Sequence, residues 1–352
     1  MASGKVRLGI VSFAHFHQHH WVKVFLQDNR VEVVGAWDND PHRLEKAAIQ
    51  YGLQKYSSLP SLLEQCTAVA VCSETSEHLP ILQLCCQAQV SVLCEKPLAP
   101  NLSLGREIAH LVQESGIRFY QSFPQRHIPS NYRIRQMIQS GALGRVTHVR
   151  KRHGHGYGLT GLENQMPWIV DPLWAGGGAF LDEGVHETDL IHWFFGEPIS
   201  VCASFSFGKP YPVETSGSAI YTFPDELLCT LETGWNWVAG GPTTEIYGEH
   251  GVLIQSHTDC ASNAGGGLLP HLVWFDGKSG KWSTLEESFD FSSIHTHAPK
   301  DFIDGIWEDR PPKTSIREGL KALELIEGVY RSVETHRTVY FPLFPEDMEK
   351  QA

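Results

Sequence analysis

The sequence of 352 residues lacks the features of a membrane protein or a nucleic-acid-binding protein. Its formal net charge is −12, so it has no excess of basic residues for nucleic acid or for an anionic lipid surface. No apolar run is long enough to span a bilayer, and the N-terminal residues lack the apolar core of a signal peptide. We therefore expect no nucleic-acid partner, no membrane partner and a cytoplasmic location.

The sequence also lacks any Cys-x-x-Cys pair, although it has eight cysteines. Because that spacing is typical of zinc sites and of redox motifs, its absence argues against both. Most of the cysteines between positions 66 and 94 lie inside apolar segments. Reduced, buried thiols in a cytoplasmic protein are the simplest interpretation.

Strand and helix patterns alternate over the first part of the chain. We predict short apolar strands at residues 6–11, 31–37, 68–71, 90–93 and 117–120, with helices between them. Strands that are apolar on both faces are typical of a parallel sheet covered by helices. Residues 1–122 are therefore predicted to form a doubly wound domain.

The pattern changes in residues 123–352, where strand signals follow one another with few helices between them. We predict strands at residues 146–152, 201–207, 218–223, 227–235 and 243–247, a loop at 263–267, and closing helices at 301–307 and 316–329. This order predicts an α+β domain with a large, mostly antiparallel open sheet. The chain as a whole is thus expected to be a two-domain α/β protein.

The turn after the first strand is where a dinucleotide pyrophosphate would lie, on backbone N–H groups at a helix start. The usual G-x-G-x-x-G motif is not intact, because its three positions are occupied by Ser12, Ala14 and His17. Serine and alanine keep the turn small, whereas His17 is bulky where close helix packing is expected. The cofactor contacts expected from this segment are Gly9, Ser12, Phe13, Ala14 and His15.

Asp38 ends the second predicted strand and strengthens the cofactor hypothesis. A carboxylate at this position can accept both adenosine ribose hydroxyls and would repel a 2′-phosphate, which favours NAD over NADP. The alternative is a turn aspartate before Asn39-Asp40-Pro41. The alternating fold favours the cofactor role.

Lys96 follows another strand of the same predicted sheet, in the segment Cys94-Glu95-Lys96-Pro97. Ligands of doubly wound sheets bind at the carboxyl ends of the strands. A lysine there can hydrogen-bond a substrate hydroxyl and favour its alkoxide form. The alternative is a surface lysine at a strand end.

The segment from Gly176 to Asp189 carries a second group of polar residues. Three glycines precede a predicted helix that ends at Gly196. Asp182, His186 and Asp189 fall at i, i+4 and i+7 and share one helix face. A carboxylate one turn before His186 can orient its ring, which makes His186 a candidate general base. A buried His–Asp pair in a structural helix is the alternative.

These residues together resemble the glucose–fructose oxidoreductase/inositol dehydrogenase (Gfo/Idh/MocA) family. The resemblance rests on Glu95-Lys96-Pro97 and on the motif from Gly176 to Asp189, and it covers nearly the whole chain. Supporting matches are His78, Arg126 with Pro129, residues 140–146, and Trp168 with Asp171-Pro172. The chain departs from the family pattern in the glycine loop, at Glu74-Thr75 and at Ile169.

The resemblance implies a Rossmann domain and a second domain whose open sheet often forms the interface of a homodimer or homotetramer. It implies an NAD(P)-dependent dehydrogenase or reductase that acts on CH–OH groups of a sugar, inositol or related polyol. Carried over by position, the catalytic residues are Lys96, Asp182 and His186. The remaining cofactor contacts expected are Ser73, Glu74, His78, Glu95 and Lys96.

The expected substrate contacts are Arg126, His155, Tyr157, Trp168, Asp182 and His186. His155 and Tyr157 follow the first strand of the second domain, where their side chains could line a substrate cleft. A polar loop without a binding role is the alternative for these two. In the implied mechanism, His186 takes the hydroxyl proton, Asp182 orients it or contacts a neighbouring hydroxyl, and Lys96 stabilises the oxyanion.

Four histidines at positions 15, 17, 19 and 20 form a dense cluster. Imidazoles spaced in this way can bind a transition metal, especially with Glu74 nearby. No H-E-x-x-H or comparable spacing is present, however, and we predict no metal.

Two alternatives to a dehydrogenase stay open. An enzyme that oxidises its substrate transiently can eliminate a glycosidic bond and recycle NAD, so it would release an aglycone without net NADH. A non-catalytic NAD- or sugar-sensing regulator would use the same fold. The altered glycine loop slightly favours a regulator, whereas the set of Lys96, Asp182 and His186 argues more strongly for an enzyme. The sequence names neither the sugar nor the direction of the reaction.

Overall fold

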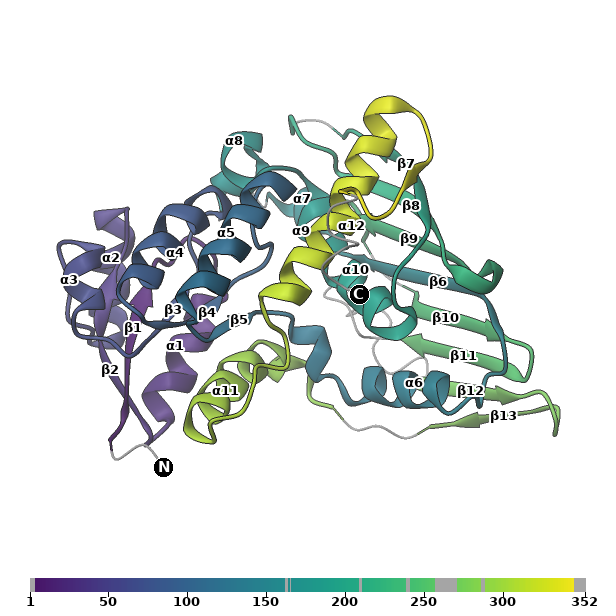
Figure 1. Ribbon diagram of the computed structural model, residues 1–352, viewed down its shortest axis with the longest axis horizontal. Helices are drawn as coiled ribbons and strands as arrows, with labels where there is room; N and C mark the ends of the chain where they lie inside the picture. Colours follow the sequence, from purple (N-terminus) through teal and green to yellow (C-terminus); the bar gives the residue numbers. More distant parts are fainter. Residues whose placement is uncertain are drawn as a thin grey trace. The chain divides into compact units, whose positions relative to one another are not determined.

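The computed structural model describes residues 4–161, 164, 166–208, 211–238, 241–256, 271–285 and 289–344 (Figure 1). Packing divides the chain into two compact units. The first comprises Met1–Pro124, Leu173–Gly176 and Ser292–Lys321, and the second comprises Gln125–Pro172, Gly177–Phe291 and Ala322–Ala352. The expected boundary between residues 122 and 123 stays a prediction. The loop expected at 263–267 lies outside the described residues.

The first unit is built on a parallel sheet with the strand order β2-β1-β3-β4-β5. Its strands are β1 (Val6–Val11), β2 (Val31–Trp37), β3 (Ala68–Val71), β4 (Ser91–Cys94) and β5 (Phe119–Gln121). Every residue of β3 is buried, because the sheet is covered on both faces. The strand order reverses between β1 and β3, and ligands of such sheets bind at the carboxyl ends next to this point. The predicted doubly wound domain is confirmed.

Helices of the first unit begin and end at local sequence signals. They are α1 (Gln18–Gln27), α2 (Pro41–Tyr51), α3 (Leu59–Leu63), α4 (His78–Gln87), α5 (Leu102–Ser115) and α11 (Ile294–Trp307). The Asp40 carboxylate caps α2, and the Asn101 side chain caps α5. Gly52 and Gly116 end these helices with φ angles of 66° and 68°, a conformation that favours glycine.

Helix α11 packs beside α1 in the first unit, as Figure 1 shows. Phe302 of α11 is fully buried and contacts Tyr120 of β5, with the ring centroids 5.0 Å apart. Trp21 and Phe25 of α1 join the same core. The sequence predicts this closing helix from residue 301, whereas the structure starts it at Ile294.

The second unit contains a large sheet in the order β13-β12-β11-β10-β6-β9-β8-β7-β14. Its strands are β6 (Val146–Gly154), β7 (Ser200–Ser206), β8 (Ser216–Thr222), β9 (Leu228–Gly234), β10 (Pro242–Gly248), β11 (Gly251–Ser256), β12 (Leu272–Asp276), β13 (Lys281–Thr284) and β14 (Val339–Tyr340). Strands β6 and β9 pair in parallel, and the other pairings are antiparallel. The expected, mostly antiparallel sheet is therefore confirmed.

Helices α6 (Pro129–Gln139), α9 (Ala179–Asp182) and α10 (Gly184–Phe195) belong to the second unit, and α12 (Ile316–Thr335) runs from the first unit into it. The sequence predicts one helix from the glycine run to Phe195, but the structure interrupts it at Glu183. Helix α10 packs against β6 and β9 and is buried from Gly184 to Ile191. The interruption places Asp182 and His186 on different helices.

Within the described residues, no helix is both long enough and apolar enough to cross a membrane.

The shorter elements are η1 (Thr75–Glu77), η2 (Pro124–His127), α7 (Tyr157–Thr160), η4 (Pro167–Val170), α8 (Pro172–Ala175), η5 (Pro224–Glu226) and η7 (Phe291–Ser293).

Candidate functional site

The β1–α1 turn of the first unit is compact without the usual glycines. Ser12 has a φ angle of 64°, in the left-handed region that glycine favours. The Phe13 N–H donates to Asp38 Oδ2 at 2.8 Å, and the His15 N–H donates to the Cys72 carbonyl at 3.0 Å. The backbone amides at these two positions are therefore hydrogen-bonded within the protein.

Gly9 lies inside β1, where a side chain would meet α3. A Cβ built at this position would lie 2.6 Å from Cys66 Sγ and 3.1 Å from Leu62 Cγ. The structure thus gives Gly9 a packing role, and its contact with a cofactor stays a prediction.

Arg43 joins the carboxylates that follow β2 and β3. Its Nη2 lies 2.8 Å from Asp38 Oδ1, and its Nη1 lies 2.7 Å from Glu74 Oε1. The Asp38 side chain has no exposed surface, whereas 27% of the Arg43 side chain is exposed. The Asp40 N–H also donates to Asp38, at 2.9 Å. The guanidinium of Arg43 is therefore an accessible charged group beside the predicted ribose site.

Two residues of the histidine cluster face Glu95 rather than Glu74. His15, His17 and Glu95 are buried, and one potential ligand atom of each lies within 4.8 Å of the others. His17 Nδ1 is 3.1 Å from Glu95 Oε2, and the ring of His295 lies 3.8 Å from that of His17. Burial and then the neighbouring His17 hold the pKa of His15 well below its usual value, so the His15 ring is neutral near pH 7.

Lys96 lies at the carboxyl end of β4 and is buried to 5% exposure. Its backbone N–H donates to Glu95 Oε1 at 3.1 Å, and burial raises the pKa of the Glu95 carboxyl. His78 Nδ1 lies 3.2 Å from the Leu98 carbonyl, and Ser73 Oγ donates to the Glu74 carbonyl at 3.2 Å. The structure brings these predicted cofactor residues to the carboxyl edge of one sheet, but their contacts with NAD stay predictions.

In the second unit, Glu183 lies between two imidazoles at the end of β6. Glu183 Oε2 is 2.7 Å from His153 Nε2, and Glu183 Oε1 is 2.7 Å from His155 Nε2. All three side chains are buried. Burial would raise the pKa of Glu183, but His155 and His153 outweigh it and hold that pKa well below its usual value. Glu183 is therefore an anion at neutral pH.

Glu187 forms a second buried group on the next turn of α10. Its Oε2 lies 2.8 Å from Lys151 Nζ, and its Oε1 lies 3.2 Å from His153 Nδ1. Gln125 donates from Nε2 to Glu187 Oε1 at 3.1 Å. Burial acts to raise the pKa of Glu187, yet Lys151 and His153 lower it overall. His153 thus connects the two glutamates, one on each ring nitrogen.

Asp182 and His186 lie beside this group. Asp182 is half-buried, and its Oδ2 accepts a hydrogen bond from Trp235 Nε1 at 3.1 Å. His186 is 5% exposed, and its ring centroid is 5.5 Å from that of His153. The catalytic roles predicted for Asp182 and His186 stay predictions.

Arg126 and Asp189 form a buried, two-pronged ion pair. Arg126 Nε lies 2.6 Å from Asp189 Oδ2, and Arg126 Nη2 lies 2.7 Å from Asp189 Oδ1. The guanidinium also lies over the Trp193 ring, 4.6 Å from its centroid. These contacts favour a structural role for Arg126. Its contact with substrate stays a prediction.

The glycine run is fixed to Glu214. The N–H groups of Gly178 and Phe180 both donate to Glu214 Oε1 at 2.9 Å, and the Tyr330 hydroxyl donates to the same oxygen at 2.6 Å. A Cβ on Gly178 would lie 2.9 Å from Glu214 Oε2. Because Gly178 has no side chain, the backbone can come close to Glu214 at this point, shortly before Asp182.

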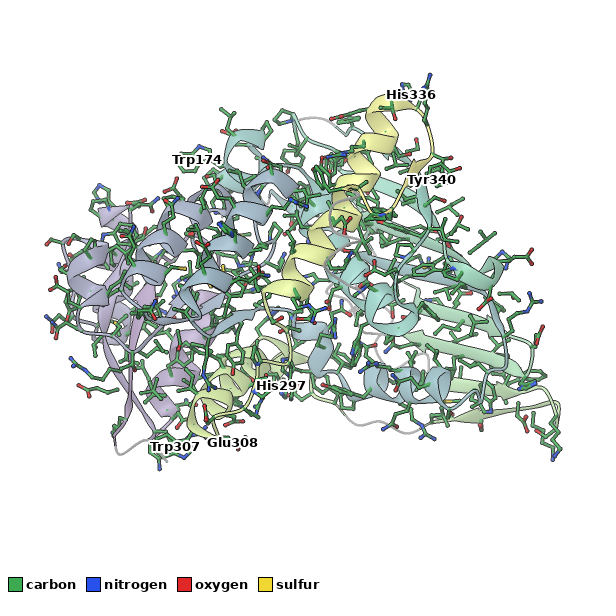
Figure 2. All side chains as sticks on the ribbon, in the orientation of Figure 1. Trp174, His297, Trp307, Glu308, His336 and Tyr340 are labelled. Carbon is green, nitrogen blue, oxygen red and sulfur yellow. The ribbon has the colours of Figure 1, made fainter. Side chains whose placement is uncertain are left out.

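The other predicted substrate contacts lie near the same segment of the sequence. Trp168 is half-buried in η4, and Tyr157 begins α7, although its side chain lies outside the described part. Trp174, in α8 of the first unit, is 40% exposed (Figure 2).

Sequence reasoning missed Lys151, Gln125, Glu183, Glu187 and His295 as members of these groups. The available signal was two glutamates, four residues apart, in a segment that is otherwise rich in apolar residues. A carboxylate on a buried helix face needs a cation or hydrogen-bond donors. The partners of the two glutamates come from positions 125 to 155. Because these positions are far away in the sequence, spacing within one helix could not identify them.

Family comparisons match both domains. Residues 6–123 match the oxidoreductase family with an NAD-binding Rossmann fold, and residues 132–254 match the GFO/IDH/MocA C-terminal domain. Together the two matches cover more than half of the chain.

Curated relatives align along nearly the full length. A myo-inositol 2-dehydrogenase from Thermotoga maritima is 23% identical over 349 residues, which cover 95% of this chain and 98% of the relative. A D-glucoside 3-dehydrogenase from Escherichia coli is 22% identical, covering 95% of this chain and 97% of the relative.

Solved structures share the fold at low identity. The WlbA dehydrogenase from Bordetella pertussis, in complex with NADH and UDP-GlcNAcA, superimposes with a TM-score of 0.82 at 21% identity and covers 98% of this chain and 100% of its own. Levoglucosan dehydrogenase, in complex with NADH and levoglucosan, gives a TM-score of 0.81 at 17% identity. The match covers 96% of this chain and 100% of the levoglucosan dehydrogenase chain. With both of its domains matched, the chain belongs to the Gfo/Idh/MocA family of oxidoreductases, and its first domain is of the NAD-binding Rossmann type.

Proposed function

We propose that this protein is an NAD-dependent dehydrogenase or reductase that acts on a secondary alcohol of a sugar, inositol or related polyol. The observation that carries the proposal is the buried His186, in a helix lined with acidic and imidazole groups, within a chain of this family. Curated relatives of similar length are named for myo-inositol, D-glucosides and D-apiose. These names support the substrate class and do not select one substrate.

The residues of the first unit fit a dinucleotide. A carboxylate follows β2, Ser12 makes the tight turn after β1, and Lys96 follows β4 at the same edge of the sheet. Asp38 would hold the adenosine ribose, with Arg43 next to it. Since the amides of Phe13 and His15 already have acceptors, the imidazoles of His15 and His17 are further donors for a phosphate. When bound, NAD supplies the hydride acceptor or donor.

Three side chains carry the proton chemistry in this proposal. His186 takes the proton of the reacting hydroxyl and returns it in the reverse direction. Lys96 donates to the same oxygen and stabilises the alkoxide. Asp182, fixed by Trp235, accepts from a neighbouring hydroxyl of the substrate or orients the reacting one. Lys96 belongs to the first unit and the other two to the second, and the proposal assigns all three to one reaction.

The substrate contacts in this proposal are His155, Trp168 and Tyr157. Arg126 is a weaker candidate because its guanidinium already binds Asp189. We further propose that the protein is cytoplasmic and forms a homodimer or homotetramer through the sheet of the second unit. Ile220 of β8 and Tyr247 of β10 support the interface, since they are 42% and 40% exposed.

The direct test is a His186→Ala variant. We expect NAD binding close to that of the wild type, measured by calorimetry, and turnover reduced by about 100- to 10,000-fold, the usual contribution of a positioned base. His148→Ala is the matched control, because His148 is an exposed histidine on β6 of the same unit. Wild-type turnover in His186→Ala would remove His186 from the role.

A panel of sugars, inositols and glycosides decides among the remaining alternatives. A dehydrogenase reduces NAD with at least one polyol, seen as absorbance of the reduced nicotinamide. Release of an aglycone without net NADH identifies the glycoside-cleaving alternative. Binding of NAD or sugar with no absorbance change for any polyol identifies a regulator.

A further inference from the structure

The group formed by His155, Asp182 and Glu183 has the composition of a metal site. One potential ligand atom of each residue lies within 4.8 Å of the others. His155 and Glu183 are buried, and Asp182 is half-buried. His153 approaches the second oxygen of Glu183, with 2.7 Å between Nε2 and Oε2. Two imidazoles and two carboxylates are a common ligand set for zinc and related divalent ions.

The contacts around His153 resemble those that support metal-bound histidines. A metal-bound imidazole usually donates its other N–H to a carboxylate, which fixes the ring and its tautomer. His153 Nδ1 lies 3.2 Å from Glu187 Oε1, and Lys151 and Gln125 hold that carboxylate in place. Gln125 Nε2 also lies 2.8 Å from His153 Nδ1. The ring of His153 is therefore held in place on its Nδ1 side, and its Nε2 faces the same carboxylate that His155 contacts.

Two arrangements fit these distances. The Nε2–H groups of the two imidazoles can donate to Glu183, or a metal ion can bind both imidazoles and the carboxylate together. The position of Asp182 favours the metal, because it adds a second carboxylate to the group within 4.8 Å.

We propose that His155, Asp182 and Glu183, with His153 beside them, bind a divalent transition metal ion of the zinc type. This proposal replaces the expectation from the sequence that no metal binds, which considered the histidines at positions 15 to 20. The group of His15, His17 and Glu95 in the first unit has one carboxylate and is the weaker candidate.

The metal would have a chemical use if the proposed function is correct. With His155, Asp182 and Glu183 as its three protein ligands, an ion of the zinc type would keep a fourth coordination position for a hydroxyl group of a polyol. It would lower the pKa of a bound hydroxyl and fix its orientation. This use rests on the proposed function, whereas the binding of the ion does not.

The test is metal binding by the full-length protein after dialysis against a chelator and then against buffer. Titration with Zn²⁺ in a calorimeter should give one site of micromolar or tighter affinity that Mg²⁺ does not fill, because imidazole ligands select against Mg²⁺. Binding of Co²⁺ should give visible absorption bands of a tetrahedral or five-coordinate ion. Neither readout depends on turnover, so failure of the proposed function would not affect it.

Three variants locate the ion. Glu183→Gln and His155→Asn should weaken Zn²⁺ binding by roughly 100-fold or more, since loss of an outer carboxylate alone costs about 10- to 100-fold. Glu187→Gln should weaken it by about 10- to 100-fold. Circular dichroism and thermal unfolding confirm that each variant is folded.

Two controls accompany these variants. Glu324→Gln makes the same substitution at a buried glutamate of the same unit, which accepts from the Leu343 N–H, and should bind Zn²⁺ as the wild type does. His17→Gln removes the histidine group of the first unit and should also leave the affinity unchanged. If Glu183→Gln does not fold, anomalous diffraction from a zinc-soaked wild-type crystal locates the ion directly.

The proposal is overturned by an affinity weaker than millimolar, or by binding that His17→Gln abolishes and Glu183→Gln retains. A zinc ion located away from Glu183 in the crystal would overturn it as well. Preference for Mg²⁺ over Zn²⁺ would contradict the assignment to a transition metal.

Discussion

The Lys151 ammonium and the Glu187 carboxylate lie 2.8 Å apart, and neither side chain has any exposed surface. Lys151 also donates to Thr244 Oγ1 at 2.9 Å. The pair joins β6 to α10, the helix that also carries His186. A buried pair of this kind is destabilising to break, because the remaining partner keeps an uncompensated charge.

We therefore expect Lys151→Met to reduce the free energy of unfolding by about 3–5 kcal/mol. Urea unfolding followed by circular dichroism measures the change. The double variant Lys151→Met/Glu187→Leu removes both charges and should recover most of the loss. An unchanged unfolding midpoint in the single variant would show that the pair contributes little to stability.

Arg126 distinguishes a structural role from a substrate contact. Arg126→Lys keeps the charge but loses the two-pronged contact with Asp189, and we expect a destabilisation of about 1.5–3 kcal/mol, the value of hydrogen bonds to charged groups. The KM for the polyol should stay within a factor of two if the role is structural. A large rise in KM with an unchanged unfolding curve would instead support the predicted substrate contact. Thermal unfolding and steady-state kinetics on the same preparations give both readouts.

Asp38 should control the binding of NAD. Asp38→Asn removes one negative charge from the contacts with Arg43 and the Phe13 N–H, and it weakens the expected bond to the ribose. We expect the Kd for NAD to rise by roughly 10-fold, which corresponds to about 1.4 kcal/mol. Asp276→Asn, at the end of β12, is the control. Equal Kd values for the two variants would contradict the cofactor role of Asp38.

The buried, neutral His15 should make the protein less stable in mild acid. Burial lowers the pKa of His15 in the folded state, and His17, Lys96 and His295 lower it further while Glu95 opposes them. The unfolded chain takes up a proton near pH 6.5, which the folded chain does not. The contribution of His15 to stability is therefore complete above about pH 6.5 and is lost as the pH falls towards its folded pKa.

Urea unfolding at pH 7.5, 6.5 and 5.5 measures this dependence. The free energy of unfolding should fall with pH, and His15→Gln should make the fall smaller. If the free energy of unfolding falls equally with pH in the wild type and in His15→Gln, titratable groups other than His15 cause the fall.

The sequence by itself determined the strands and helices whose patterns are strong. The apolar runs at residues 6–11, 31–37 and 68–71 are strands with the predicted bounds. These strands are predictable because nearly all of their residues are at least partly buried, so each strand is a short, almost continuous apolar run. The motif around Lys96 and His186 also indicated the family, which the comparisons confirmed.

Edge strands and long-range partners could not be predicted in this way. Strand β13 is exposed at every residue, so its sequence has no alternation of apolar and polar positions to detect. Helix α11 was expected among the closing helices, but only its packing showed that it belongs with α1 in the first unit.

The tertiary structure alone decided which groups meet at the candidate site. Glu183 lies between His153 and His155, and Glu187 lies against Lys151, although about 30 residues of chain separate them. Sequence spacing reports neighbours along one helix or strand, whereas these contacts depend on how α10 crosses β6. Once buried there, each carboxylate needs a cation or a donor, and the fold supplies both from a strand far away in the sequence.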